Sequence, residues 1–490
     1  MLPLAVLLVL VWPSVLGGPY EQPRFVIPTW ATPESFLSGP DDGYTSTIRT
    51  SPNYKVVHNA WWQAHRFYAF LRPEDMNKQD AVEDGLSTNQ AIIRMPVANM
   101  GSFRDNLQIG YVPGNSLLVD FTFQTFADHL GHWAELMVPI YSMLRDGAWQ
   151  KDVQLNGTSK ASTIIDRVVT TNMNRHHGPW FSAVFQTALQ PATQAGQSQP
   201  YIIDYADLET YHKLSWVVFE NLLVVQDRYT HPQNRKGFAG SDHGDLWRYD
   251  RCERYVSHDY VVRFSQPHHG REFRQAIYAR ERLPAPQPWT PGQPPQLPRT
   301  ITFLLQAGDD YPGITNHEEV FKMLQEVGGA HGMKARVMTL TPEASLGTHL
   351  AVAANTGVLV GRHSSAMAAS LFMPPGSAVL ELLPFKWEWA KVSMLYYNIT
   401  QSIGDIHHFA WRANHYKWAD FKNSSDRKYH TWTSEECHAR ECLLVHAKAS
   451  MIVDLAAVKQ MLLSKLPRIL TGAPVEELRE PWPLDTHSRP

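Results

Sequence analysis

Residues 357–385 read GVLVGRHSSAMAASLFMPPGSAVLELLPF, and this stretch decides the fold of the second half of the chain. An aliphatic run at 357–361 is followed by a polar turn, a short apolar segment at 365–372, a Pro-Pro-Gly turn and a second aliphatic run at 378–382. When a helix connects two buried strands, the strands pair in parallel, because the helical connection returns the polypeptide to the same end of the sheet. The stretch therefore predicts a β-α-β unit of a parallel sheet.

The same alternation of strands and helices extends upstream. The expected elements are, in order, strand 300–305, helix 316–327, strand 335–340, helix 342–354, strand 357–361, helix 365–372 and strand 378–382. This order is typical of a Rossmann-like domain, in which crossover helices cover a parallel sheet. A C-terminal amphipathic helix over about residues 442–466 is expected to pack back on this domain. Its apolar stripe consists of Met451, Leu455, Val458, Leu462 and Leu466.

A proline-rich segment at residues 284–299 divides the chain, with seven prolines in sixteen positions. Proline has a fixed φ and no amide donor, so this segment is predicted to be an extended linker. We expect an N-terminal domain at 19–283, a C-terminal domain at 300–470 and a tail at 471–490.

Composition excludes several classes of protein. The 490 residues are 43% apolar and 19% charged, which is not typical of disordered, collagen-like or coiled-coil chains. The net charge is −3, from 44 basic and 47 acidic residues, and it indicates no nucleic-acid partner. Three cysteines allow at most one disulfide. The motifs G-x-S-x-G, Walker A and G-x-G-x-x-G are missing, which removes the main support for a hydrolase, an NTPase or a dehydrogenase.

The N-terminus predicts entry into the secretory pathway. Residues 1–18 contain an apolar run that ends in two glycines, which fits a signal peptide or a short signal anchor. Asn156, Asn398 and Asn423 each begin an N-glycosylation sequon. We expect a protein of the Golgi or endoplasmic reticulum lumen, with secretion as the alternative. A membrane is a partner only if the leader stays uncleaved as an anchor.

The turn after the strand 357–361 contains the first candidate binding residues, Arg362, His363, Ser364 and Ser365. Ligands of open parallel sheets bind beyond the carboxyl ends of the strands, where helix N-termini favour anions. Arg362 and His363 can donate charge-assisted hydrogen bonds to a diphosphate. Glu381, expected just past the next strand, can accept hydrogen bonds from ribose hydroxyls. The alternative is structural: the serines cap a helix, His363 packs in the turn and Glu381 is a solvated or paired acid.

The quoted stretch resembles the signature of glycosyltransferase family 61. That signature is a strand ending in Val-Gly, a His-Gly-Ala turn, a helix, Leu-Phe-Met, a Pro-Gly turn and a strand ending in Glu-Leu-Pro. The resemblance extends to residues 316–320 and 453–455 and covers roughly the C-terminal 170 residues. It implies a GT-B-like α/β fold with two Rossmann-like domains facing a cleft. It also implies inverting, metal-independent transfer of xylose, N-acetylglucosamine or arabinose from a UDP-sugar to a glycan or glycoprotein.

The resemblance assigns Arg362, His363, Ser364, Ser365 and Glu381 to the donor site, with no cofactor besides the UDP-sugar itself. Two departures from the family pattern affect this site. Residues 305–315 contain two acids and no arginine where the family has basic residues, and Ser364-Ser365 replaces Gly-Ala. These departures predict a different donor affinity or donor choice, and a non-catalytic glycan-binding or scaffold protein is the alternative function.

Inverting transfer requires a base that takes the proton of the acceptor hydroxyl. The segment 128–139 resembles the family's His-x-x-x-acid stretch and nominates Glu135 as the base, with His132 as the second candidate. The alternative is a surface acid on a helix, with His132 stacked against Trp133. The chain contains no Asp-x-Asp pair, so no metal site is predicted. The adjacent histidine pairs 176–177, 268–269 and 407–408 are interpreted as surface residues, because neighbouring side chains diverge on a strand and do not share a helical face.

Overall fold

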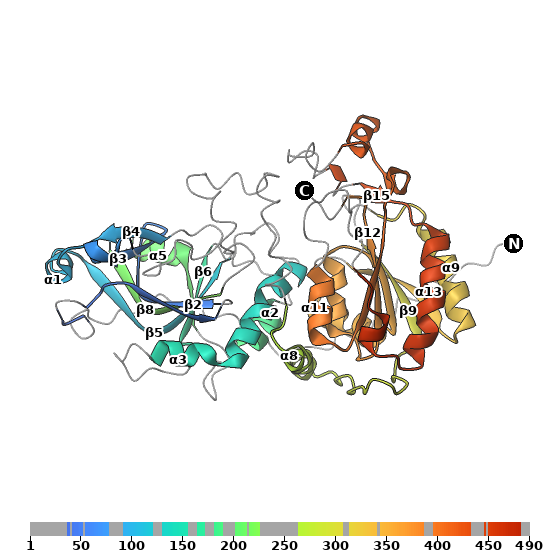
Figure 1. Ribbon diagram of the computed structural model, residues 1–490, viewed down its shortest axis with the longest axis horizontal. Helices are drawn as coiled ribbons and strands as arrows, with labels where there is room; N and C mark the ends of the chain where they lie inside the picture. The colour runs from blue at the N-terminus through green and yellow to red at the C-terminus, as the bar shows by residue number, and fades with distance from the viewer. Residues whose placement is uncertain are drawn as a thin grey trace.

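The computed structural model describes residues 37–39, 42–51, 54–77, 92–120, 130–154, 164–171, 181–189, 201–212, 215–225, 263–306, 313–340, 344–386, 395–432, 445–446 and 449–481. The predicted leader at 1–18 and the sequon at Asn156 lie outside these residues. Within them, no helix is both long enough and apolar enough to cross a membrane. Figure 1 shows two lobes, each built on its own β-sheet, with helices between them.

The N-terminal lobe contains an eight-stranded sheet in the order β4-β3-β2-β8-β5-β6-β7, with β1 paired to β2. Its strands are β1 (Ser46–Ser51), β2 (Tyr54–Gln63), β3 (Arg66–Leu71), β4 (Ile92–Pro96), β5 (Ile109–Asp120), β6 (Arg167–Thr171), β7 (Tyr201–Asp204) and β8 (Trp216–Val225). Its helices are η2 (Pro73–Asp75), α1 (Met100–Arg104), α2 (Leu130–Asp146), α3 (Ala148–Gln154), α4 (Phe181–Leu189) and α5 (Tyr205–His212).

The N-terminal sheet is only partly parallel. Strands β8, β5, β6 and β7 pair in parallel, as in a Rossmann-like sheet, whereas β2 is antiparallel to β1, β3 and β8. A two-residue hairpin joins β2 to β3 through Ala64 and His65, both at positive φ, 47° and 62°. Such turns match the twist of antiparallel strands. The lobe is therefore α/β with a mixed sheet.

Aromatic side chains form much of the N-terminal core. Trp61 and Trp62 are adjacent on β2 and are both fully buried, because they point to opposite, covered faces of the sheet. Trp61 makes edge-to-face contact with Phe70 at a centroid distance of 5.0 Å. These aromatic residues of the N-terminal half thus contribute to packing.

The C-terminal lobe contains a fully parallel sheet in the order β10-β9-β11-β12-β13. Its strands are β9 (Thr300–Gln306), β10 (Lys334–Leu340), β11 (Val358–Arg362), β12 (Ala378–Leu383), β13 (His407–Arg412) and the separate short pair β14 (Ala419–Asp420) and β15 (Ser450–Met451). Its helices are α8 (Pro267–Arg280), α9 (His317–Ala330), α10 (Leu346–Ala354), η7 (Ser365–Phe372), α11 (Leu395–Ile403), η9 (Tyr416–Trp418), η10 (Ser424–His430), α13 (Leu455–Leu470) and η11 (Val475–Leu478). The predicted alternation from 300 to 382 is therefore present.

The predicted C-terminal helix begins too early. Residues 450–451 form β15, and α13 starts only at Leu455. The Asp454 side chain accepts a hydrogen bond from the Ala457 amide at 3.2 Å, so it is an N-cap that starts the helix at this point. Met451 belongs to the strand, and its neighbour Ser450 pairs with Asp420.

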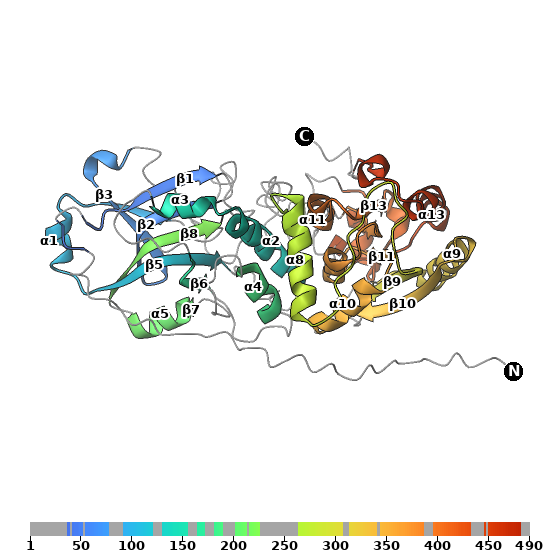
Figure 2. The same cartoon turned by 90° about the horizontal axis from the view of Figure 1, so that it is seen from below.

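The proline-rich segment 284–299 contains no helix or strand, and it lies along the C-terminal lobe. The Gly292 amide donates to the Gly472 carbonyl at 2.8 Å, and Trp289 Nε1 donates to the Gln293 carbonyl at 2.7 Å. Figure 2 shows α8, which precedes this segment, standing between the two lobes.

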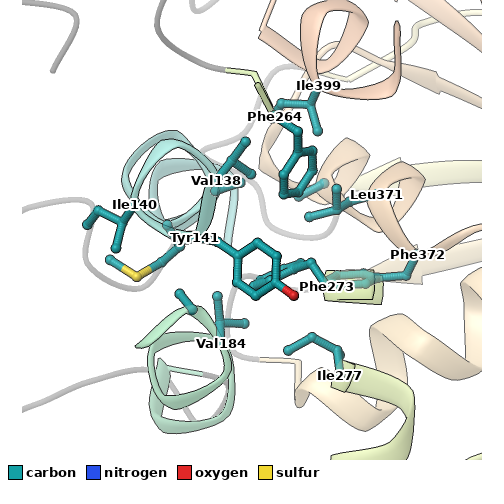
Figure 3. Packing of buried hydrophobic residues seen from close by; sticks show 14 of the residues in the cluster. Val138, Ile140, Tyr141, Val184, Phe264, Phe273, Ile277, Leu371, Phe372 and Ile399 are labelled. Carbon is teal, nitrogen blue, oxygen red and sulfur yellow. The ribbon is translucent and has the colours of Figure 1, made fainter. Parts of the chain in front are cut away.

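The two lobes meet through an apolar helical layer. Helix α2 packs against η7, α8 packs against α11, and α4 packs on α2 and α8. Buried side chains interdigitate in this layer: Val138, Tyr141, Phe264, Phe273, Leu371, Phe372 and Ile399 (Figure 3). Arg274 on α8 is 3% exposed and donates to Asp405 Oδ1 at 3.1 Å and to the Met373 carbonyl at 3.0 Å. The Tyr278 hydroxyl donates to the Phe372 carbonyl at 2.9 Å. Burial of this layer and these hydrogen bonds hold α8 between the two lobes.

Candidate functional site

The strand order creates a topological switch point between β9 and β11. Helix α9 follows β9 toward β10 on one face of the sheet, whereas η7 follows β11 toward β12 on the other face. At such a point the two connections diverge and leave a crevice beyond the carboxyl ends of the strands, where doubly wound sheets bind their ligands.

A pocket of about 190 Å³ lies at this switch point. Its lining comes from the ends of β9 and β11 and from the segment that enters α9: Leu304, Leu305, Gly313, Ile314, His317, Arg362 and Ser364. Among the residues predicted for the donor site, Arg362 and Ser364 are therefore brought to one pocket. The acidic segment 307–312, which departs from the family pattern, lies outside the described residues.

Hydrogen bonds to β15 fix one wall of the pocket. The Thr315 amide donates to the Met451 carbonyl at 2.8 Å, and the Met451 amide donates to the Gly313 carbonyl at 3.0 Å. The Thr315 hydroxyl donates to Asp420 Oδ2 at 2.9 Å, which ties the same wall to β14. The wall is thus held by residues more than a hundred positions away in the sequence.

The N-terminus of α9 opens at this wall. His317 is the first residue of the helix, is exposed, and places Nδ1 3.1 Å from the Ile314 carbonyl. The first turn of a helix has amides that are not used within the helix and carries a partial positive charge. The pocket therefore combines a helix N-terminus, whose first turn also carries the exposed acids Glu318 and Glu319, with a cationic side chain.

Arg362 supplies that cationic side chain. It is 8% exposed at the end of β11, and it donates to the Ala449 carbonyl at 3.3 Å. Burial lowers the pKa of its guanidinium to about 10, so the group still carries its charge at neutral pH. A charged guanidinium at the wall of a pocket favours an anionic ligand.

The two serines have different roles at the start of η7. Ser364 occupies the N-cap position, but its hydroxyl makes no capping hydrogen bond, and its carbonyl accepts from the Met367 amide at 3.0 Å. The alternative in which the Ser364 side chain only caps this helix is therefore wrong, and the residue lines the pocket. Ser365 is half-buried and is the first residue of η7.

Glu381 lies inside β12, within the bounds expected for that strand, and not just past the strand end as the donor-site prediction has it. Its backbone is in register with Gly361 and Ala410, and the residue is fully buried. One carboxylate oxygen pairs with His363 Nδ1, and the other is 3.0 Å from His408 Nε2. Burial raises the pKa of this carboxyl, but the two histidines outweigh burial and hold the pKa below its usual value. Both oxygens are thus engaged within the protein, so Glu381 is a paired acid that orients His363.

The predicted donor residues are divided between the two faces of the sheet. Arg362 follows Val358 and Val360 toward the face that α9 and α13 cover. His363 and Glu381 point toward the face that α11 covers, where the His363 ring lies 5.2 Å from the Tyr396 ring. Alternation along a strand explains this division, because consecutive side chains project to opposite faces.

His408 is a residue of this site that the sequence did not predict. The histidine pairs were interpreted as surface residues, but His407, His408 and His269 are 2%, 4% and 2% exposed. A signal was present: His407-His408 precedes Phe-Ala-Trp, a β-rich run, and strands inside a parallel sheet are buried on both faces.

The candidate bases Glu135 and His132 belong to α2, but their side chains lie outside the described part of the structure. Two sequons can be placed. Asn423 is exposed at the N-cap of η10, whereas Asn398 is half-buried in α11 and its sequon residue Thr400 is fully buried. Among the described residues, no group of three or more His, Cys, Asp or Glu side chains is arranged to hold a metal ion.

No family model matches this sequence, and a search of curated proteins found no match. The resemblance to glycosyltransferase family 61 therefore rests on the motif residues of the C-terminal half, which form β11, η7 and β12.

Proposed function

We propose that the protein is an inverting, metal-independent glycosyltransferase. It would transfer xylose or N-acetylglucosamine from a UDP-sugar to a glycan or glycoprotein in the lumen of the secretory pathway. The observation that supports this proposal best is the pocket at the switch point, where Arg362 and the N-terminus of α9 meet. This combination suits the diphosphate of a nucleotide sugar.

The pocket volume limits which part of the donor it holds. About 190 Å³ is less than the roughly 300–1,000 Å³ of typical small-molecule sites. We assign the pocket to the diphosphate and its neighbouring ribose, with Arg362 and Ser364 as donors to phosphate oxygens. The remaining donor atoms would extend out of the pocket, and the acceptor would be held by the N-terminal lobe, as the resemblance to a GT-B enzyme implies.

The reaction would need one base and one stabilised leaving group. Glu135 or His132 would take the proton of the acceptor hydroxyl as its oxygen attacks the anomeric carbon. The bond from that carbon to the diphosphate oxygen breaks, and UDP leaves with the electron pair. Arg362 and the helix amides would stabilise the charge that develops on UDP.

Binding of UDP tests the donor site. The full chain, secreted from a eukaryotic host, should unfold at a higher temperature in millimolar UDP, because a ligand that binds only the folded state stabilises it. Arg362→Gln should lose the shift, and Lys459→Gln, which removes an exposed charge on α13, should retain it. No shift with wild-type protein would contradict the proposal.

Turnover tests the chemistry. A panel of UDP-sugars with UDP release as the readout should identify one preferred donor, and mass spectrometry of acceptors should show the added sugar. Glu135→Ala or His132→Ala should abolish transfer and leave UDP binding intact. Binding to glycans without any UDP-sugar turnover would instead favour the non-catalytic glycan-binding protein.

A further inference from the structure

A continuous hydrogen-bonded chain connects α11 with the turn that forms the pocket. Thr400 Oγ1 is 2.7 Å from His408 Nδ1, and His408 Nε2 is 3.0 Å from Glu381 Oε2. Glu381 Oε1 then pairs with His363 Nδ1. All four side chains are nearly or fully buried. The hydrogen-bonded chain therefore runs through the interior of the protein, from α11 across β13 and β12 to the end of β11.

The hydrogen positions in this hydrogen-bonded chain follow from Glu381, because a carboxylate can only accept. His408 Nε2 and His363 Nδ1 therefore donate to its two oxygens. An imidazole that carries one proton and donates it through Nε2 accepts at Nδ1, so the Thr400 hydroxyl donates to His408 Nδ1. The same hydroxyl lies 2.9 Å from the Tyr396 carbonyl and 3.0 Å from the Tyr397 carbonyl. His363 is thereby held with its Nδ1 proton toward Glu381 and with Nε2 on the opposite side of the ring.

An arrangement of this kind contributes little net stability. Burial of ionic and polar groups has a desolvation cost that well-packed apolar residues avoid, so such a network is weak evidence for a stabilising role. Its position is informative, because His363 lies between Arg362 and Ser364, the two turn residues that line the pocket on the other face. Orienting His363 on one face of the sheet therefore restrains the same turn on the other face.

We propose that His408 is a positioning residue that, through Glu381, orients His363 and so places Arg362 and Ser364 for binding of a nucleoside diphosphate. The inference rests on the proposed donor site, since the ligand is the one assigned there. His408 itself does not line the pocket. Its effect is indirect, like that of the residues that orient metal-ligating histidines.

The test compares three variants of the full chain. His408→Leu removes both polar atoms and should weaken UDP binding roughly tenfold, in line with the loss of other orienting partners. His408→Gln keeps one donor toward Glu381 and should restore most of the affinity. His407→Leu is the matched control, because His407 is also buried on β13 but points to the opposite face. A folded His408→Leu protein with wild-type UDP affinity would overturn the proposal.

A spectroscopic readout separates this inference from the proposed function. Nitrogen-15 NMR of histidine distinguishes the two tautomers, and His363 should show the Nδ1-protonated form in wild type and a mixture in His408→Leu. If wild-type protein does not bind UDP, the proposed function fails and this measurement alone decides the positioning role. An unchanged His363 tautomer in His408→Leu would overturn it.

Thr400→Val serves if His408→Leu does not fold. It removes the hydroxyl that bonds His408 Nδ1 and lies near two helix carbonyls, and it should change the His363 signal and UDP affinity in the same direction as His408→Leu, by less. Thr400→Val also destroys the Asn398 sequon, so Asn398→Gln, which leaves the hydroxyl in place, is its control. If Thr400→Val leaves both readouts at the wild-type values, the positioning role is wrong.

Discussion

The two faces of the C-terminal sheet hold buried charge in different ways. On the face under α11, the Glu381 carboxylate is surrounded by His363 and His408, and both oxygens are engaged. On the face under α9, the Arg362 guanidinium is buried at the wall of a pocket and burial lowers its pKa. Glu381 is enclosed and its removal would leave two histidines without their acceptor, whereas Arg362 also borders a pocket, where its charge favours a ligand of opposite sign.

Removal of the paired carboxylate should have the largest effect. Glu381→Ala leaves two histidines without their acceptor and should lower the free energy of unfolding by about 3–5 kcal/mol. Chemical denaturation at pH 7 measures this loss. Glu326→Ala, which removes an exposed acid that pairs with Lys459, should cost less than about 1 kcal/mol. Equal losses for the two variants would contradict the scaffold role of Glu381.

Low pH should destabilise the protein through His407, which lies on the opposite face of the sheet from His408. Burial, and then Lys465, lower the pKa of this histidine from 6.5 to about 4. Because the folded state disfavours the protonated form, the stability that His407 contributes is present above pH 6.5 and is lost as the pH falls toward 4. The loss amounts to about 3 kcal/mol.

His407→Leu should remove this part of the acid sensitivity. Its free energy of unfolding should match or exceed that of wild type at pH 7.5 and fall less steeply between pH 6.5 and pH 4. Denaturation curves at four pH values in this window make the comparison. A variant whose stability falls in parallel with that of wild type would exclude His407 as a source of the decline.

The charge at the pocket should affect binding more than folding. Arg362→Gln should weaken UDP binding at least about tenfold, which corresponds to about 1.4 kcal/mol. Isothermal titration calorimetry measures the affinity, and Lys459→Gln controls for the loss of one positive charge. If Arg362→Gln binds UDP as tightly as wild type, the assignment of the pocket to the diphosphate is wrong.

The smallest effect concerns the start of α13, which covers the pocket face. Asp454→Ala removes the N-cap and should lower stability by about 1 kcal/mol. UDP affinity should stay at the wild-type value, because Asp454 neither lines the pocket nor belongs to the hydrogen-bonded chain from Thr400 to His363. Thermal unfolding with and without UDP checks both expectations, with Ser464→Ala on the exposed side of α13 as the control. A loss of UDP affinity would show that helix position and pocket are coupled.

Much of the C-terminal fold could be predicted from local pattern. The strands β9 to β12 and the helices between them lie within a few residues of their expected bounds, because aliphatic runs and helical spacing are local properties. The start of α13 was missed because its apolar stripe continues into β15, and only the Asp454 cap separates the two. In the N-terminal lobe, the antiparallel placement of β2 depends on pairing with β8, more than 150 residues later.

The candidate site was predictable in part. The turn Arg362 to Ser365 follows from the position of a polar turn at the carboxyl end of a strand. The role of Glu381 could not be read from its position, because a carboxylate next to a strand end is equally compatible with solvent, ribose or an ion pair. His408 was missed because its partner is distant in sequence and adjacent only across the sheet.

The sequence by itself determined the parallel β-α rhythm, the proline-rich division of the chain and the turn with Arg362, since these depend on residues close together along the chain. Only the tertiary structure decided which face each turn residue occupies, that Glu381 is enclosed by two histidines, and that the segment at 313–315 closes a pocket against Arg362. These features arise from strand register and from contacts between distant segments. Their energies depend on burial, which no local stretch of sequence defines.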